Sequence, residues 1–128
     1  MFTNRITGSG TVHYTDFTPL GLLYNENVFI SVKADSPVKS GRDLVERLRK
    51  DPAALSVAIA SVLGNHIHMG IAIPAKIAGV DVKKMKVVPF KSSGDSLTAL
   101  AGGHIDVAAS TFGTILPHLQ AGRVRVIA

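Results

Sequence analysis

Apolar residues fall along the chain in two alternating patterns, short continuous runs and stripes at helical spacing. The continuous runs predict strands at 28–32, 57–60, 85–90, 104–109 and 124–128. The stripes and their capping residues predict helices at 41–50, from the turn at 61 to 79, from 92 to 101, and at 115–121. This alternation favours an α/β fold, with one mostly parallel sheet that carries helices on both faces.

The stretch from Ser56 to Asp81 is the most informative part of the pattern. An apolar strand ends at Ser61, and Gly64 and Asn65 separate it from a helix that Gly79 closes. A strand that turns into a helix leaves backbone N–H groups unpaired at the helix start, and such groups suit an anionic ligand.

Two more junctions of small polar residues, 91–95 and 110–114, follow the next two predicted strands. In a parallel sheet with right-handed crossovers all three junctions lie at one edge, where ligands bind in such folds. We therefore expect them to converge and to offer N–H groups, hydroxyls and one cation to a carboxylate or phosphate. The alternative is that these residues serve only as caps and turns. The candidate ligand-binding residues are Ser61, Gly64, Asn65, His68, Lys91, Ser92, Ser93, Gly94, Ser110 and Thr111.

Composition narrows the possible functions. The 128 residues are 46% hydrophobic and 18% charged, as in one globular domain, with a net charge of +5. The basic residues are scattered and the chain lacks Trp, so we expect no nucleic-acid partner. The absence of cysteine excludes disulfides and thiolate chemistry. The first ten residues lack an apolar signal core, and no apolar run would span a membrane, so we expect a soluble protein, a mature form or part of a larger protein.

Metal binding and catalysis have little support in the sequence. On a helix, His66 and His68 point about 200° apart, and no third ligand has motif spacing, so no metal or other cofactor is expected. A triad of Ser61, His68 and Asp106 can be drawn, but the G-x-S-x-G motif is missing. We expect no catalytic residues; the alternative is a small hydrolase or transferase that uses His68 and Asp106.

The order of several short motifs resembles a known family. The motifs are Asp16–Leu20, Ala34–Pro37, Lys39-Ser40, Asp43-Leu44, Gly64-Asn65 with His68, Val88–Gly94, Leu97-Thr98, Gly102–Asp106, Leu116–Leu119 and Ala121–Arg125. Together they resemble the tripartite tricarboxylate transporter substrate-binding proteins, the TctC-like or Bug solute receptors of the bacterial periplasm. Ile59 and Ala60 stand where the family usually has Gly-Ser, Val62 where it often has Gly, and Phe90 where it usually has Tyr.

The resemblance implies a two-lobed, non-catalytic receptor that closes on a small organic carboxylate, such as a di- or tricarboxylate, and serves a membrane transporter from the periplasm. By this likeness residues 24–128 form one ligand-binding lobe, similar to the second lobe of a type II periplasmic binding protein, and residues 1–23 cross from a missing first lobe. A third alternative is a stand-alone interaction domain that forms a homodimer through the surface left by the missing lobe.

Overall fold

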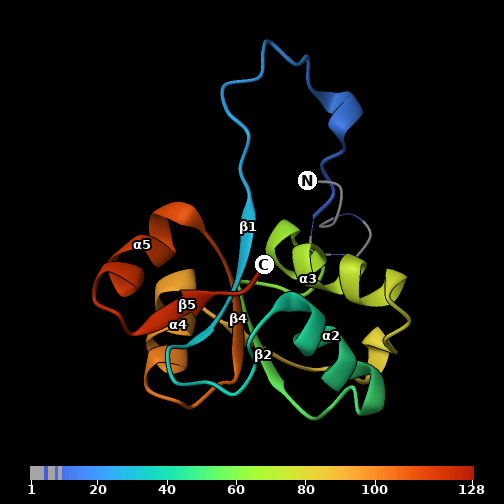
Figure 1. The fold of residues 1–128 in the computed structure, drawn as a ribbon. Helices are drawn as coiled ribbons and strands as arrows, with labels where there is room; N and C mark the ends of the chain where they lie inside the picture. The colour runs from blue at the N-terminus through green and yellow to red at the C-terminus, as the bar shows by residue number, and fades with distance from the viewer. Residues whose placement is uncertain (1–4, 6–7, 9) are drawn as a thin grey trace.

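The computed structural model describes residue 5, residue 8 and residues 10–128. Its five strands form one sheet in the order β3-β2-β4-β1-β5 (Figure 1). The strands are β1 (Val28–Lys33), β2 (Ser56–Ala60), β3 (Lys86–Phe90), β4 (Val107–Thr111) and β5 (Val124–Val126). The prediction that these five apolar runs share one sheet is confirmed.

Four of the five strands run in the same direction. β2 pairs in parallel with β3 and β4, whereas β1 is antiparallel to both β4 and β5. Because Val28 lies opposite Thr111, β1 begins at the edge of the sheet where β4 ends. The preceding residues leave the sheet at that edge and form an extended arm, residues 10–27, which projects above the body (Figure 1). The arm holds one short 3-10 helix, η1 (Tyr14–Asp16).

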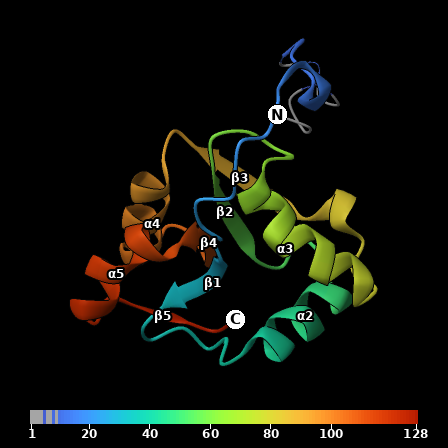
Figure 2. The ribbon, with the colours of Figure 1, turned by 90° about the horizontal axis from the view of Figure 1, so that it is seen from above.

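Helices cover both faces of the sheet, as predicted. Seen from above, α2 (Gly41–Lys50) and α3 (His66–Ile77) lie on one side, and α4 (Ser93–Ala101) and α5 (Phe112–Gln120) on the other (Figure 2). A second 3-10 helix, η2 (Val82–Lys84), precedes β3. Among the described residues, no helix is long and apolar enough to cross a membrane.

The two faces of the sheet carry separate buried clusters. Val57 and Ile59 pack with the cluster under α2 and α3, whereas Ala58 packs with the cluster under α4 and α5. Every residue of β2 is buried. A strand that is covered on both faces needs no polar alternation, which explains why this segment is a continuous apolar run.

The junction between β4 and α5 differs from the prediction. Strand 104–109, loop 110–114 and helix 115–121 were expected, but β4 continues to Thr111 and α5 begins at Phe112. Ser110 is fully buried and lies opposite Phe29 of β1, so this small polar residue belongs to the sheet. The helix consequently starts one turn earlier than expected, and Pro117 lies in its interior instead of its first turn.

Candidate ligand-binding site

The carboxyl ends of β2, β3 and β4 lie side by side at one edge of the sheet. β2 occupies the middle position, and Ala60 lies opposite Phe90 at the ends of β2 and β3. Since the three strands are mutually parallel, the starts of α3, α4 and α5 also meet at this edge. The expected convergence of the three junctions is therefore present in the topology, and their binding of a ligand stays a prediction.

The junction between β2 and α3 holds a strained residue. Ser61 has a φ of 64°, in the left-handed region that non-glycine residues rarely occupy. Its N–H donates to the carbonyl of Phe90 at 2.8 Å, which extends the pairing of β2 with β3 beyond the strand end. Backbone strain of this kind costs about 1–3 kcal/mol and is concentrated at functional sites. The hydroxyl of Ser61 is thereby held at the exposed edge of the sheet.

Asn65 ties the end of β2 to the first turn of α3. As the N-cap residue, its Oδ1 accepts the N–H of His68 at 2.9 Å. Its Nδ2 donates to the carbonyl of Ala60 at 2.6 Å. Both ends of the amide are used within the protein, so Asn65 positions the helix start. The N–H groups of His66 and Ile67 precede the capped one and point outward by helix geometry.

His68 orients the same junction. Its Nδ1 accepts a hydrogen bond from the backbone N–H of Gly64 at 2.9 Å, and Gly64 has a φ of 86°. Burial lowers the pKa of His68 below its ordinary value, so the imidazole is neutral at pH 7. Because Nδ1 is the acceptor, the ring proton resides on Nε2. His68 thus shapes the loop.

The junction between β3 and α4 combines a cap with an exposed cation. The hydroxyl of Ser92 accepts the N–H of Asp95 at 3.1 Å and donates to the Asp95 carboxylate at 2.9 Å. Ser92 therefore fills the capping role that its spacing predicted. Ser93 and Gly94 form the first turn of α4 and turn their backbone N–H groups toward the edge. Lys91, directly before the cap, is exposed and brings a positive charge to the site.

The start of α5 is capped less completely than the other two. Thr111 occupies the N-cap position without a side-chain cap hydrogen bond, and its hydroxyl lies 3.4 Å from that of Thr114. Next to it, the buried hydroxyl of Ser110 has no hydrogen-bond partner among the described residues. An N-terminal turn without a side-chain cap keeps its backbone donors for water or a ligand. The sequence gives no signal for this feature, because small polar residues such as those at 110–114 are typical of a loop.

Asp106 lies far from His68. Its carboxylate accepts the N–H of Ser56 at 2.8 Å and the hydroxyl of Ser56 at 2.6 Å. These contacts join the amino ends of β4 and β2, whereas His68 lies beyond the carboxyl end of β2. The pair suggested for a hydrolase or transferase is not assembled, because the length of a strand separates its members. The described residues also contain no group of three or more His, Cys, Asp or Glu side chains placed to hold a metal.

Two further features of this edge were not predicted from the sequence. Glu26 at the base of the arm lies 3.5 Å from Nε2 of His66, the first residue of α3. The rings of Phe29 and Phe112 pack with centroids 5.9 Å apart. Both contacts join residues that are far apart in the sequence, so local spacing gives no signal for them.

Comparison with known proteins identifies one family. The family model described as "Tripartite tricarboxylate transporter family receptor" matches residues 11–128. A curated relative from Pseudomonas sp. (strain P51), the "UPF0065 protein in tcbD-tcbE intergenic region", is 30% identical over 112 residues, which are 88% of this chain and 32% of the relative.

Solved structures show the same fold. A TctC solute-binding protein from Polaromonas superposes with a TM-score of 0.78 at 21% identity, over 98% of this chain and 41% of that one. MatC from Rhodopseudomonas palustris, solved with bound malate, gives a TM-score of 0.73 at 26% identity, over 88% of this chain and 37% of that one. The chain thus spans between about a third and two fifths of the length of these relatives.

Proposed function

Because the chain belongs to the tripartite tricarboxylate transporter receptor family, we propose that it forms the lobe of a solute receptor that binds a small organic carboxylate without catalysis. The observation that carries the proposal is the meeting of three helix starts at one sheet edge, together with the incomplete cap of α5. The malate bound to MatC supports a carboxylate as the ligand class.

The chemistry of the edge fits an anion. Each helix start presents outward N–H groups and the positive end of the helix dipole, which together favour negative charge. Lys91 adds a full positive charge beside the start of α4. In this proposal, the backbone N–H groups of Ser93 and Gly94 and the hydroxyls of Ser61 and Thr111 contact the carboxylate. Gly64, whose N–H donates to His68, keeps the loop in shape. Asn65, His68 and Ser92 hold the junctions in shape, since their side chains already bond within the protein.

The arm supports the proposed division of the chain. Leu20, Leu22 and Leu23 are 99%, 81% and 94% exposed. Large apolar side chains this exposed mark a surface that another part of a protein covers. We propose that residues 1–23, of which 1–4, 6, 7 and 9 lie outside the described residues, cross from a first lobe, and that residues 24–128 form the second. Such a two-lobed receptor would deliver its ligand in the periplasm to membrane transporter components.

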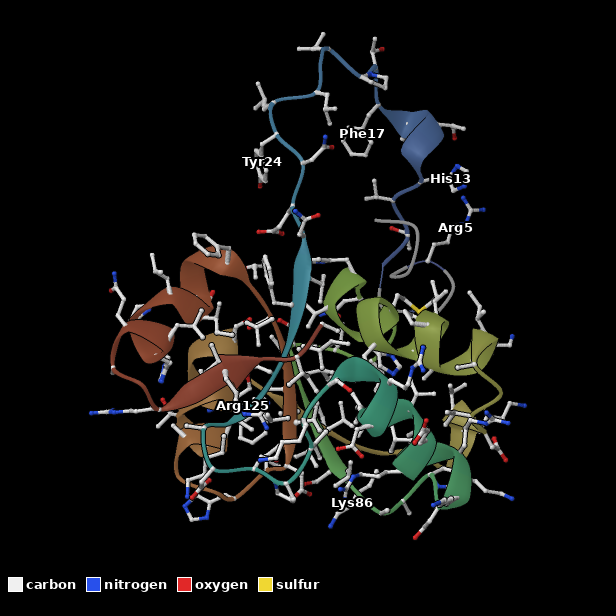
Figure 3. All side chains as sticks on the ribbon, in the orientation of Figure 1. Arg5, His13, Phe17, Tyr24, Lys86 and Arg125 are labelled. Atoms are coloured by element: carbon white, nitrogen blue, oxygen red, sulfur yellow. The ribbon has the colours of Figure 1, made fainter. Side chains whose placement is uncertain are left out.

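A titration of the ¹⁵N-labelled chain with malate tests the proposal. We expect amide shifts at the starts of α3, α4 and α5, and a weaker response in Lys91→Ala. Lys86→Ala is the matched control, because Lys86 begins β3 at the opposite edge (Figure 3). If the chain hydrolyses an ester or an amide and His68→Ala abolishes this activity, the receptor proposal is wrong and the enzyme alternative holds. If the mass in solution doubles as the protein concentration rises and no carboxylate binds, the dimeric interaction domain is the correct alternative.

A further inference from the structure

A hollow of about 350 Å³ lies beside the start of α5, at the base of the arm. Two distant parts of the chain line it: residues 24–27 with Phe29, and Phe112 with Gly113. Figure 3 shows Tyr24 on the arm above the sheet, at the end of the molecule where α5 begins. Phe112 directly follows Thr111, so the hollow adjoins the carboxylate site of the proposed function.

Aromatic side chains gather in this hollow although the chain has few of them. Tyr24, Phe29 and Phe112 are three of only five Phe and two Tyr residues in the sequence. Phe29 and Phe112 are inclined at 50° to each other, and Tyr24 and Phe112 are 74% and 55% exposed. Exposed aromatic side chains that line one hollow form an apolar surface, against which a ring or an aliphatic chain of a ligand can pack.

The polar donors lie at one end of the hollow. The first turn of α5 has no side-chain cap from Thr111, so the N–H groups of Phe112 and Gly113 face outward. Ser110 lies opposite Phe29, so its side chain is on the same face of the sheet, and its buried hydroxyl has no hydrogen-bond partner among the described residues. Ser110 is fully buried and is absent from the lining, so the donors that reach the hollow are the backbone groups of Phe112 and Gly113.

The arm contributes one acidic side chain to the lining of the hollow. Glu26 lines the hollow, with its carboxylate 3.5 Å from His66. The described lining contains no Lys or Arg. A second carboxylate placed in the hollow would therefore meet a like charge, whereas an uncharged body would meet aromatic rings.

We infer that the ligand is a monocarboxylate with an aromatic or aliphatic body, and that the body fills the hollow lined by Tyr24, Phe29 and Phe112. The inference rests on the proposed function, because the helix starts must hold the carboxylate. The aromatic lining selects an apolar body, and Glu26 selects against a second negative charge.

The test compares 3-phenylpropionate with malate in titrations of the ¹⁵N-labelled 128-residue chain. We expect phenylpropionate to bind about fivefold more tightly, the affinity gain of one aromatic contact. Its shifts should include residues 24–29 and 112–113. Phe112→Ala should lower the ratio of the two affinities toward one. Tyr24→Ser gives the same readout on the exposed arm if Phe112→Ala fails to fold.

Two more variants test the effect of the Glu26 charge and the effect of a residue outside the hollow. Glu26→Gln should lower the ratio by strengthening malate binding. Ile77→Ala should leave the ratio unchanged, because Ile77 is an exposed residue at the end of α3 and is absent from the lining. Equal or tighter malate binding to the unaltered chain, or a ratio insensitive to both Phe112→Ala and Tyr24→Ser, would overturn the inference and leave the proposed function intact. If neither carboxylate shifts any amide at the helix starts, the proposed function itself fails.

Discussion

Arg125 holds the segment that precedes α2 through its hydrogen bond to the carbonyl of Ser36, with Nη2 and the oxygen 3.0 Å apart. The same guanidinium also donates to the carbonyls of Ala34, Val38 and Lys39. One side chain on β5 thus satisfies four backbone acceptors of the connection from β1 to α2. The planar guanidinium of arginine has five N–H donors, whereas a lysine ammonium has three and cannot serve all four carbonyls.

Replacing Arg125 with lysine should therefore destabilise the fold. We expect Arg125→Lys to lower the free energy of unfolding by about 1–3 kcal/mol, because carbonyls lose charged hydrogen-bond donors. Urea unfolding followed by circular dichroism measures the change. Arg123→Lys is the control and should stay within about 0.5 kcal/mol, as expected for an exposed surface position. Equal effects of the two variants would contradict the role assigned to Arg125.

Gly70 is required by the packing of α3 on β1. A Cβ at Gly70 would lie 2.8 Å from Cγ1 and 2.9 Å from Cβ of Val28. Both distances are shorter than real Cβ contacts, so one of the two residues would have to move. Gly70→Ala should cost about 1–3 kcal/mol of unfolding free energy through overpacking, despite the higher helix propensity of alanine. Gly113→Ala is the matched control, because a Cβ there meets nothing within 4 Å. Thermal unfolding of both variants checks the difference, and a stabilised Gly70→Ala protein would show that Val28 can move.

The neutral state of His68 predicts an acid-sensitive fold. Burial lowers its pKa in the folded protein below the unfolded value of about 6.5. The unfolded chain consequently binds the proton more readily, so the stability from neutral His68 is present above that value. It is lost as the pH falls toward the folded pKa. We expect His68→Gln to flatten the decline in unfolding free energy between about pH 7 and pH 5.

Denaturant melts at several pH values measure this slope. His66→Gln is the control, since His66 is exposed and its ring is not bonded to the backbone of the Gly64 loop. A decline that stays as steep in His68→Gln as in the unaltered chain would contradict the role assigned to the buried imidazole.

Local chemistry predicted much of the fold. Helix α2 has the predicted bounds, and the hydroxyl of Ser40 accepts the N–H of Asp43 at 3.2 Å. The carboxylate of Asp43, however, accepts the N–H of Lys39 instead of completing the capping box with Ser40. Caps and apolar runs depend on neighbours in the sequence, and such features are accessible without a structure.

Features that depend on distant partners were not accessible. Ser110 resembles a loop residue until its pairing with Phe29 buries it in the sheet. β1 runs opposite to the other four strands, and no local pattern in the sequence indicates that direction. The sequence therefore placed the three junctions at one edge of the sheet, and their binding of a ligand stays a prediction. Which of their residues are caps and which keep unused donors is visible only in the hydrogen bonds of the structure.

The affinity of the isolated chain for carboxylates should be low. An anion site built from helix starts is strong where water is excluded, because charge interactions weaken severalfold in a high dielectric. Here Ser61, Lys91 and Ser92 are exposed to solvent. Such an open half-site offers about 3–5 kcal/mol, which corresponds to a dissociation constant between about 0.2 and 6 mM.

Isothermal calorimetry with mono-, di- and tricarboxylates measures that constant. Adding a first lobe in the same polypeptide should tighten binding by orders of magnitude, since the added lobe excludes water and supplies further contacts. Micromolar binding by the chain, with a mass that stays monomeric, would mean that the single lobe carries a complete site. The proposed two-lobed receptor would then be wrong, because closure by another lobe would have nothing to add.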